Sequence, residues 1–115
     1  MKFANAAALL LLLTTPALAD AKKTIGDVVL ECTVTGSGKD GFDLTADNKK
    51  GSADRDCSAT CKLSKKDGST IEKSYSKKAG KNLKVWMGGE ASISGAPLSN
   101  PNITSGSCRD RKSVV

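Results

Sequence analysis

Apolar and polar residues alternate along most of the chain, in short segments separated by clusters of Gly, Asp, Asn and Lys. In residues 28–34, Leu30 and Cys32 fall on one face of an extended chain, and Glu31 and Thr33 fall on the other. Successive side chains of a β-strand point to opposite sides, so this period of two predicts a strand with one buried face.

Six further segments repeat this alternation. The predicted strands cover residues 28–34, 42–46, 57–63, 70–76, 83–87, 91–93 and 103–108. Lys65-Lys66-Asp67-Gly68 has the residue types of a tight turn, which predicts a β-hairpin over residues 56–76. Residues 47–56 are polar and predict a loop or a poor edge strand.

Short strands at near-regular spacing are typical of an all-β domain. The pattern predicts a single small immunoglobulin-like β-sandwich of about seven strands, stapled by disulfides. A small β-barrel has similar sequence signals and is the alternative. The order of the strands within the sheets stays open.

Residues 1–19 have the three parts of a secretory signal peptide. Lys2 gives the cationic start, residues 6–13 the apolar run, and Ala17-Leu18-Ala19 the cleavage motif, which places cleavage before Asp20. The apolar run is well short of the roughly 20 residues that span a bilayer. We therefore expect a periplasmic or secreted protein with no transmembrane segment after removal of the signal peptide.

Residues 20–115 then form a single β domain, with residues 20–25 and 109–115 predicted as flexible ends. This part of the chain contains three aromatic residues, Phe42, Tyr75 and Trp86. A small domain with so few large apolar side chains buries little surface, and cross-links are the expected compensation.

All four cysteines lie beyond the predicted signal peptide, at positions Cys32, Cys57, Cys61 and Cys108. An oxidising compartment favours two disulfides. On one strand Cys57 and Cys61 would lie about 13 Å apart, whereas bonded cysteines need Cα atoms within about 7 Å. Two connectivities remain, and we favour Cys32–Cys57 with Cys61–Cys108 over Cys32–Cys61 with Cys57–Cys108.

The chain contains no histidine, which removes the commonest general acid–base residue. The Cys-x3-Cys spacing is one residue longer than a redox pair and lacks the second ligand pair of a zinc site, so the sequence indicates no metal and no cofactor. A two-carboxylate hydrolase or a calcium loop would draw on the aspartates before the hairpin, but their mixture with basic residues favours a solvated loop and no enzyme. These aspartates are Asp40, Asp43, Asp47, Asp54 and Asp56.

Lysines are concentrated in and after the predicted hairpin, in a chain whose formal net charge is +6. The candidate binding surface consists of Lys62, Lys65, Lys66, Lys73, Lys77, Lys78, Lys84 and Trp86. The possible partners of this cationic surface are anionic envelope polysaccharide or a protein, whereas nucleic acid is disfavoured because no set of aromatic residues is interleaved with the lysines. Alternatively, the lysines keep the sheet soluble and its edges unpaired.

Trp86 falls on the face opposite Leu83, Val85 and Met87 if the strand is regular. It is either an exposed binding anchor beside Lys84 or a residue packed in a two-sided core or opposite a register break. Large aromatic side chains are mostly buried, which favours the core.

The Cys-x3-Cys strand and Lys-Asp-Gly turn of residues 57–76, together with Gly-Ala-Pro-Leu at 95–98 and the last cysteine, resemble small exported proteins of rhizobium-like Gram-negative bacteria. That resemblance implies an exported bacterial β-sandwich and transfers no functional residue.

Together these features favour a non-catalytic binding module for an anionic envelope polymer or a protein partner. One alternative is a secreted enzyme inhibitor that presents residues 95–102 as an exposed loop held by disulfides. The other is a small hydrolase that depends on carboxylates.

Overall fold

The computed structural model describes residues 20–110, so the predicted signal peptide and residues 111–115 lie outside the described part. Seven strands form the fold: β1 (Asp20–Ile25), β2 (Val28–Thr35), β3 (Gly41–Asp47), β4 (Arg55–Ser64), β5 (Thr70–Ala79), β6 (Lys84–Glu90) and β7 (Ser99–Asp110). All pairings are antiparallel.

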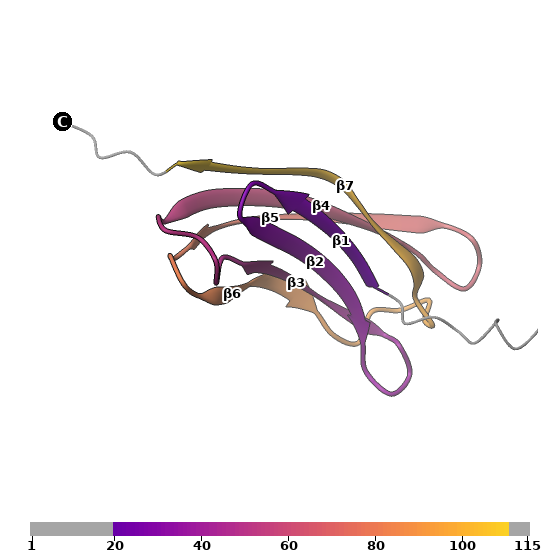
Figure 1. Cartoon of the computed structure of the whole chain (residues 1–115). Coiled ribbons are helices and arrows are strands. Elements are labelled where there is room, and N and C mark those ends of the chain that lie inside the picture. Colours follow the sequence, from indigo (N-terminus) through magenta and orange to yellow (C-terminus); the bar gives the residue numbers. More distant parts are fainter. Residues whose placement is uncertain (1–19, 111–115) are drawn as a thin grey trace, which may run out of the picture.

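Two sheets face each other, with strand orders β1-β2-β3-β6 and β5-β4-β7 (Figure 1). This arrangement confirms the predicted small β-sandwich. The division into four and three strands matches a constant-type immunoglobulin domain, but the strand order differs. There the first, second, fifth and fourth strands make the larger sheet, whereas here the sixth strand follows the third.

The prediction of a flexible end at residues 20–25 is wrong, because these residues form β1 and pair along their whole length with β2. Gly26 and Asp27 join the two strands in a two-residue hairpin turn. Gly26 has φ of 60°, the left-handed conformation that a type II′ turn requires at its first central residue. The Gly-Asp pair between two apolar residues was the sequence signal for this hairpin.

The predicted short strand at residues 91–93 does not form. Instead, residues 91–98 make a loop fixed by backbone hydrogen bonds: Ile93 N–H donates to the Asp40 carbonyl, and Leu98 N–H to the Lys39 carbonyl, each at 2.8 Å. β7 begins at Ser99, earlier than predicted, because it is an edge strand that tolerates Pro101.

The core lies between the sheets and follows the predicted alternation. Buried apolar residues are Val28, Leu30, Cys32, Phe42, Leu44, Ala46, Cys57, Ala59, Cys61, Leu63, Ala79, Met87, Leu98 and Ile103. Phe42 is the one aromatic residue buried in the described part. The partly buried Tyr75 packs beside Phe42, and the centroids of the two rings are 6.3 Å apart. Tyr75 also lies so close to Gly88 that a Cβ at position 88 would collide with its ring.

The disulfides join Cys32 to Cys61 and Cys57 to Cys108. Cys57 and Cys61 therefore each form a long-range bond, as their spacing predicts, but the connectivity that we favoured is wrong. Cys57 lies directly opposite Cys108 in the β4–β7 register, with Cα atoms 4.0 Å apart. Cys61 lies on the same inner face of β4 and bonds Cys32 of β2 across the core. Strand order decides the pairing, and residue spacing alone does not contain it.

Asn48 organises the end of the sandwich where β3 leaves the sheet. Its side chain is fully buried, and Nδ2 donates toward the carbonyls of Ala53, Ala79 and Gly80. Its backbone N–H donates to the Leu83 carbonyl at 2.8 Å. One residue thus ties together the β3–β4 loop, the end of β5 and the start of β6.

The two disulfides differ in burial, and this difference makes a stability prediction. Replacing Cys32 and Cys61 by Ala should lower the free energy of unfolding by about 3–5 kcal/mol, because it removes both a chain constraint and sulfur atoms at the centre of the core. Replacing Cys57 and Cys108 by Ala should cost less, about 2–4 kcal/mol, although its loop is longer, because Cys108 is only partly buried.

Urea unfolding of both double variants measures this order. Non-reducing peptide mapping of the variant lacking Cys32 and Cys61 should recover Cys57 bonded to Cys108. Two free thiols in that variant would contradict the Cys57–Cys108 pairing. The reverse order of stability would contradict the larger contribution predicted for the Cys32–Cys61 bond.

Candidate functional site

The outer face of the four-stranded sheet is the surface that carries Trp86. Pairing between strands arranges its side chains in rows: Lys22, Glu31, Thr45 and Trp86 form one row across β1, β2, β3 and β6, and Thr24, Val29, Asp47 and Lys84 form the next. We call this surface, together with Asp43, the outer platform. Charged residues, threonines and Val29 surround one large indole on it.

The prediction that Trp86 packs in the core is wrong, since 56% of the residue is exposed. Its Nε1–H donates to Oδ1 of Asp43 at 3.0 Å. A register shift in the β3–β6 pairing inserts Met87 as an extra residue, so Met87 and Gly88 both face inward while Trp86 stays outside. The bulge therefore fills the core without the tryptophan, and the hydrogen bond fixes the exposed ring.

Glu31 lies in the same row as Trp86. A hydrogen bond with the Asp20 side chain, assisted by partial burial, raises the pKa of the Glu31 carboxyl above its ordinary value. The charges of Lys22 and Lys84 act in the opposite direction and are the weaker influence. The platform thus carries both signs of charge around the indole.

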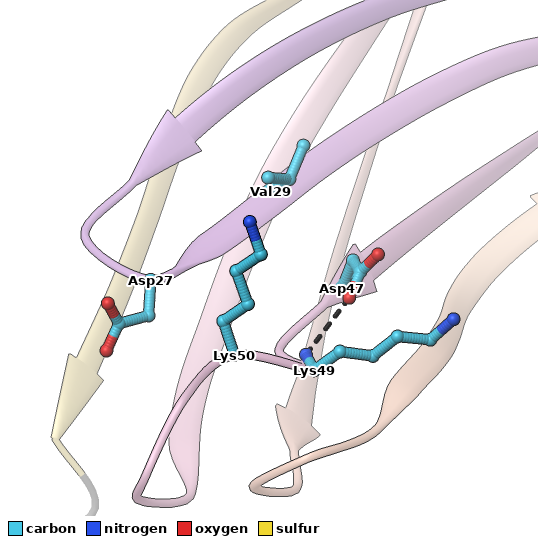
Figure 2. Close-up of a pocket in the computed structure, with 5 residues that line it drawn as sticks. All are labelled: Asp27, Val29, Asp47, Lys49 and Lys50. Atoms are coloured by element: carbon cyan, nitrogen blue, oxygen red, sulfur yellow. Dashed lines mark hydrogen bonds between the residues drawn. The ribbon is translucent and has the colours of Figure 1, made fainter.

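A small open pocket of about 240 Å³ continues the outer platform at one end of the sandwich. It is lined by Asp27, Val29, Asp47, Lys49 and Lys50. Figure 2 shows the Lys50 side chain extending toward Val29 between the two aspartates, while the Lys49 side chain runs past Asp47. The backbone N–H of Lys49 donates to Oδ1 of Asp47 at 3.0 Å, and this bond holds the side of the pocket formed by these two residues.

Strand alternation distributes the candidate lysines over four places. Lys62 and Lys78 point outward from the three-stranded sheet, Lys65 and Lys66 lie at the β4–β5 turn, Lys73 and Lys77 point from β5 toward the other sheet, and Lys84 lies on the outer platform. Two of them form ion pairs: Lys73 with Glu90 at 2.9 Å and Lys78 with Asp54 at 3.7 Å. The eight residues of the predicted binding surface therefore do not lie on one surface of the fold.

Part of the predicted surface does come together, along the edge where β5 approaches β6. Lys73 bonds Glu90, and the Tyr75 ring lies on Gly88, so the two strands run antiparallel past each other at this edge. Lys77 lies farther along β5, on the same face as Lys73. Glu90 raises the pKa of Lys73 by a hydrogen bond and by its charge, while burial raises the pKa of Tyr75.

The outer face of the three-stranded sheet is rich in hydroxyl groups, a feature that the sequence analysis missed. It contains Ser58, Thr60, Ser64, Thr70, Ser74, Ser76, Ser99, Ser105 and Ser107. Ser58 bonds Ser76 and Thr60 bonds Ser74, each at 2.7 Å, and Ser105 donates to Thr60 at 3.2 Å. Because these hydroxyls satisfy one another across strands, they stabilise the sheet. The signal was the recurrence of Ser and Thr at every second position.

The predicted aspartate cluster is dispersed. Asp43 holds Trp86, Asp47 holds the loop at Lys49, and Asp54 accepts from the Lys81 N–H at 2.9 Å. Asp40 packs beside Gly36, and Asp56 faces outward from β4. Residues 20–110 contain no group of three or more His, Cys, Asp or Glu side chains placed to hold a metal ion.

The loop considered for an inhibitor is fixed without a disulfide. Lys66 N–H donates to the Gly95 carbonyl at 2.8 Å, and Leu98 is buried. The last part of residues 95–102 belongs to β7. Hydrogen bonds to neighbouring loops hold this segment, and the disulfide at Cys108 lies farther along β7.

These features define a disulfide-linked β-sandwich that exposes one fixed tryptophan on a polar sheet. Comparison with protein-family models gives no match, and neither curated proteins nor solved structures match the chain. Within residues 20–110, no helix has the length and apolar character needed to cross a membrane.

Because Trp86 is the one tryptophan of the chain, intrinsic fluorescence reports on its ring directly. Asp43→Ala should lower the steady-state anisotropy of this fluorescence, because the indole loses the hydrogen bond that fixes it. Asp47→Ala, on the same strand and face, should leave the anisotropy unchanged. Equal anisotropy in wild type and Asp43→Ala would show that packing on the platform holds the ring.

Glu31 gives the outer platform a pH dependence. A carboxyl whose folded pKa is raised stabilises the fold below its unfolded pKa, and this contribution is lost as the pH rises through the folded pKa. Glu31→Gln should therefore match the wild-type stability below about pH 4 and become more stable than wild type toward neutral pH. Urea unfolding as a function of pH measures this gain.

An Asp20→Asn background supplies the control for Glu31, because it removes the carboxyl that most strongly raises the Glu31 pKa. There the pH-dependent gain should shrink. A gain that stays the same would assign the raised pKa to burial alone.

Proposed function

We propose that this protein is a non-catalytic binding module, exported to the periplasm or the cell exterior, that binds an anionic envelope polysaccharide. The observation that carries the proposal is the exposed indole of Trp86, held in one orientation by Asp43. Leaving so large an aromatic ring in water forgoes the stabilisation that its burial would give. Binding recovers that stabilisation.

A sheet face of mostly polar and charged side chains around one aromatic ring suits a sugar chain. The apolar face of a sugar ring stacks on an indole, while its hydroxyls bond to groups such as those of Thr45 and Glu31 in the same row. A protein partner would instead favour a larger desolvated cluster of aromatic and aliphatic residues. This difference favours polysaccharide over protein.

The anionic character of the ligand follows from the lysines nearest to the indole. Lys84 lies two residues from Trp86 on the same face of β6, and Lys77 extends from β5, the strand whose Lys73 pairs with Glu90 of β6. Lys73 contributes less because Glu90 pairs with it. Two ammonium groups beside a stacking surface match a polymer that carries a carboxylate near each stacked ring.

Export is supported by two disulfides within residues 20–110, since such bonds persist in oxidising compartments. The predicted signal peptide agrees with this compartment. The leading expectation from the sequence, a binding module, is thus kept, and its surface is narrowed from the whole hairpin to the β5–β6 edge and the outer platform.

Retention on immobilised alginate, a polymer of uronic acids, tests the function. Trp86→Ala should weaken binding about tenfold or more, and Lys77→Gln with Lys84→Gln should weaken it and flatten its dependence on salt. The matched control is Lys62→Gln with Lys78→Gln, which removes the same charge from the outer face of the three-stranded sheet. It should bind like wild type.

Equal losses in the two double variants would show that net charge, and no particular surface, causes retention. If wild-type protein passes through alginate and through native envelope polysaccharide at low salt without delay, the proposed function is wrong.

A further inference from the structure

We infer that the pocket lined by Asp27, Val29, Asp47, Lys49 and Lys50 binds one acidic sugar unit, a hexuronate. This inference rests on the proposed function and adds to it the chemical class of the sugar and a second subsite. The pocket volume of about 240 Å³ is smaller than sites for drug-sized ligands and fits a single small polar molecule.

The walls of the pocket supply three kinds of contact. Val29 gives an apolar surface in the middle of a polar face, and Lys50 extends toward it (Figure 2). Neither ammonium group of Lys49 and Lys50 has an ion-pair partner within residues 20–110. Both groups are therefore available to bind an anion.

The two carboxylates of the pocket are already positioned by other groups. Asp47 accepts from the Lys49 backbone N–H, and Asp27 lies 3.8 Å from a guanidinium nitrogen of Arg55. Arg55 lies on β4 and also pairs with Asp110 on β7, within the three-stranded sheet. Carboxylate oxygens held in this way have further lone pairs, which accept hydrogen bonds from ligand hydroxyls.

This combination selects among ligands. A carboxylate on the ligand compensates the lysines, its hydroxyls bond the aspartates, and a ring face covers Val29. A neutral sugar leaves the ammonium groups unpaired, and a phosphate group brings up to two negative charges close to two carboxylates. A hexuronate carries one negative charge and several hydroxyls, which matches the walls best.

The pocket is continuous with the Trp86 surface. Val29 pairs with Asp47, and Asp47 pairs with Lys84 in the row next to Thr45 and Trp86. Rows on one face of a strand are about 6.6 Å apart. A sugar chain stacked on the indole therefore passes Lys84 and reaches the pocket with its next units.

The test uses residues 20–115 of the chain and three soluble probes: sodium glucuronate, glucose and inorganic phosphate. In amide NMR spectra, glucuronate should shift the signals of Asp27, Val29 and Asp47–Lys50, with an affinity about tenfold higher than that of glucose. Lys50→Gln should remove this preference. Lys62→Gln, on the other sheet, should retain it.

Each outcome addresses one of the two proposals. Phosphate binding as strong as glucuronate binding would overturn the inference, because the site would then be a general anion site. The same holds if glucuronate shifts no pocket signal while alginate retention still depends on Trp86. Glucuronate shifts in a protein that alginate does not retain would support the ligand class of the pocket and overturn the polymer function.

Discussion

The disulfide between Cys32 and Cys61 is the interaction on which this structure most depends. The core holds one fully buried aromatic ring, Phe42, and is otherwise built from aliphatic residues, alanines, one methionine and the disulfide-bonded cysteines. Two sheets packed on so little apolar surface gain limited stabilisation from burial. A covalent bond across their interface lowers the entropy of the unfolded chain and keeps the sheets in contact at the centre. Short side chains elsewhere in the core are tolerable because this bond is present.

A second constraint lies at the end of the sandwich that carries the pocket. Asn48 is buried and bonds three carbonyl groups and the start of β6. A Cβ at Gly51 would collide with its side chain, so the loop closes tightly around the amide. Asn48 is followed directly by Lys49 and Lys50, which line the pocket. Its backbone N–H bonds Leu83, the residue that precedes Lys84 and the strand of Trp86. Asn48 thus positions both parts of the proposed site.

Strand periodicity predicted the features that the sequence of a single strand determines. It missed the features that depend on which strands pair with each other. It placed the core face of β2, the β4–β5 hairpin and the separation of Cys57 from Cys61, because alternation fixes these locally. The disulfide partners follow from β4 having β7 as its neighbour, which no local pattern contains. Trp86 was assigned to the core because large aromatic side chains are mostly buried, although alternation placed it opposite Val85 and Met87, where the structure has it. β1 was missed since its stability comes from pairing with β2 and its own pattern is weak.

The lysines illustrate why a concentration of charge along the sequence does not define one surface of the fold. Lys77 and Lys78 are adjacent in sequence, yet alternation sends them to opposite faces of β5. Charged side chains that point inward on an edge strand prevent pairing with another sheet, and Lys73 and Lys77 occupy such positions. Their positions fit the alternative interpretation, in which lysines keep the edges of the sheet unpaired. A surface that selects a ligand needs groups held in one geometry, and here the indole fixed by Asp43 meets that condition. The proposed binding surface consequently includes only the few lysines on the side of that ring.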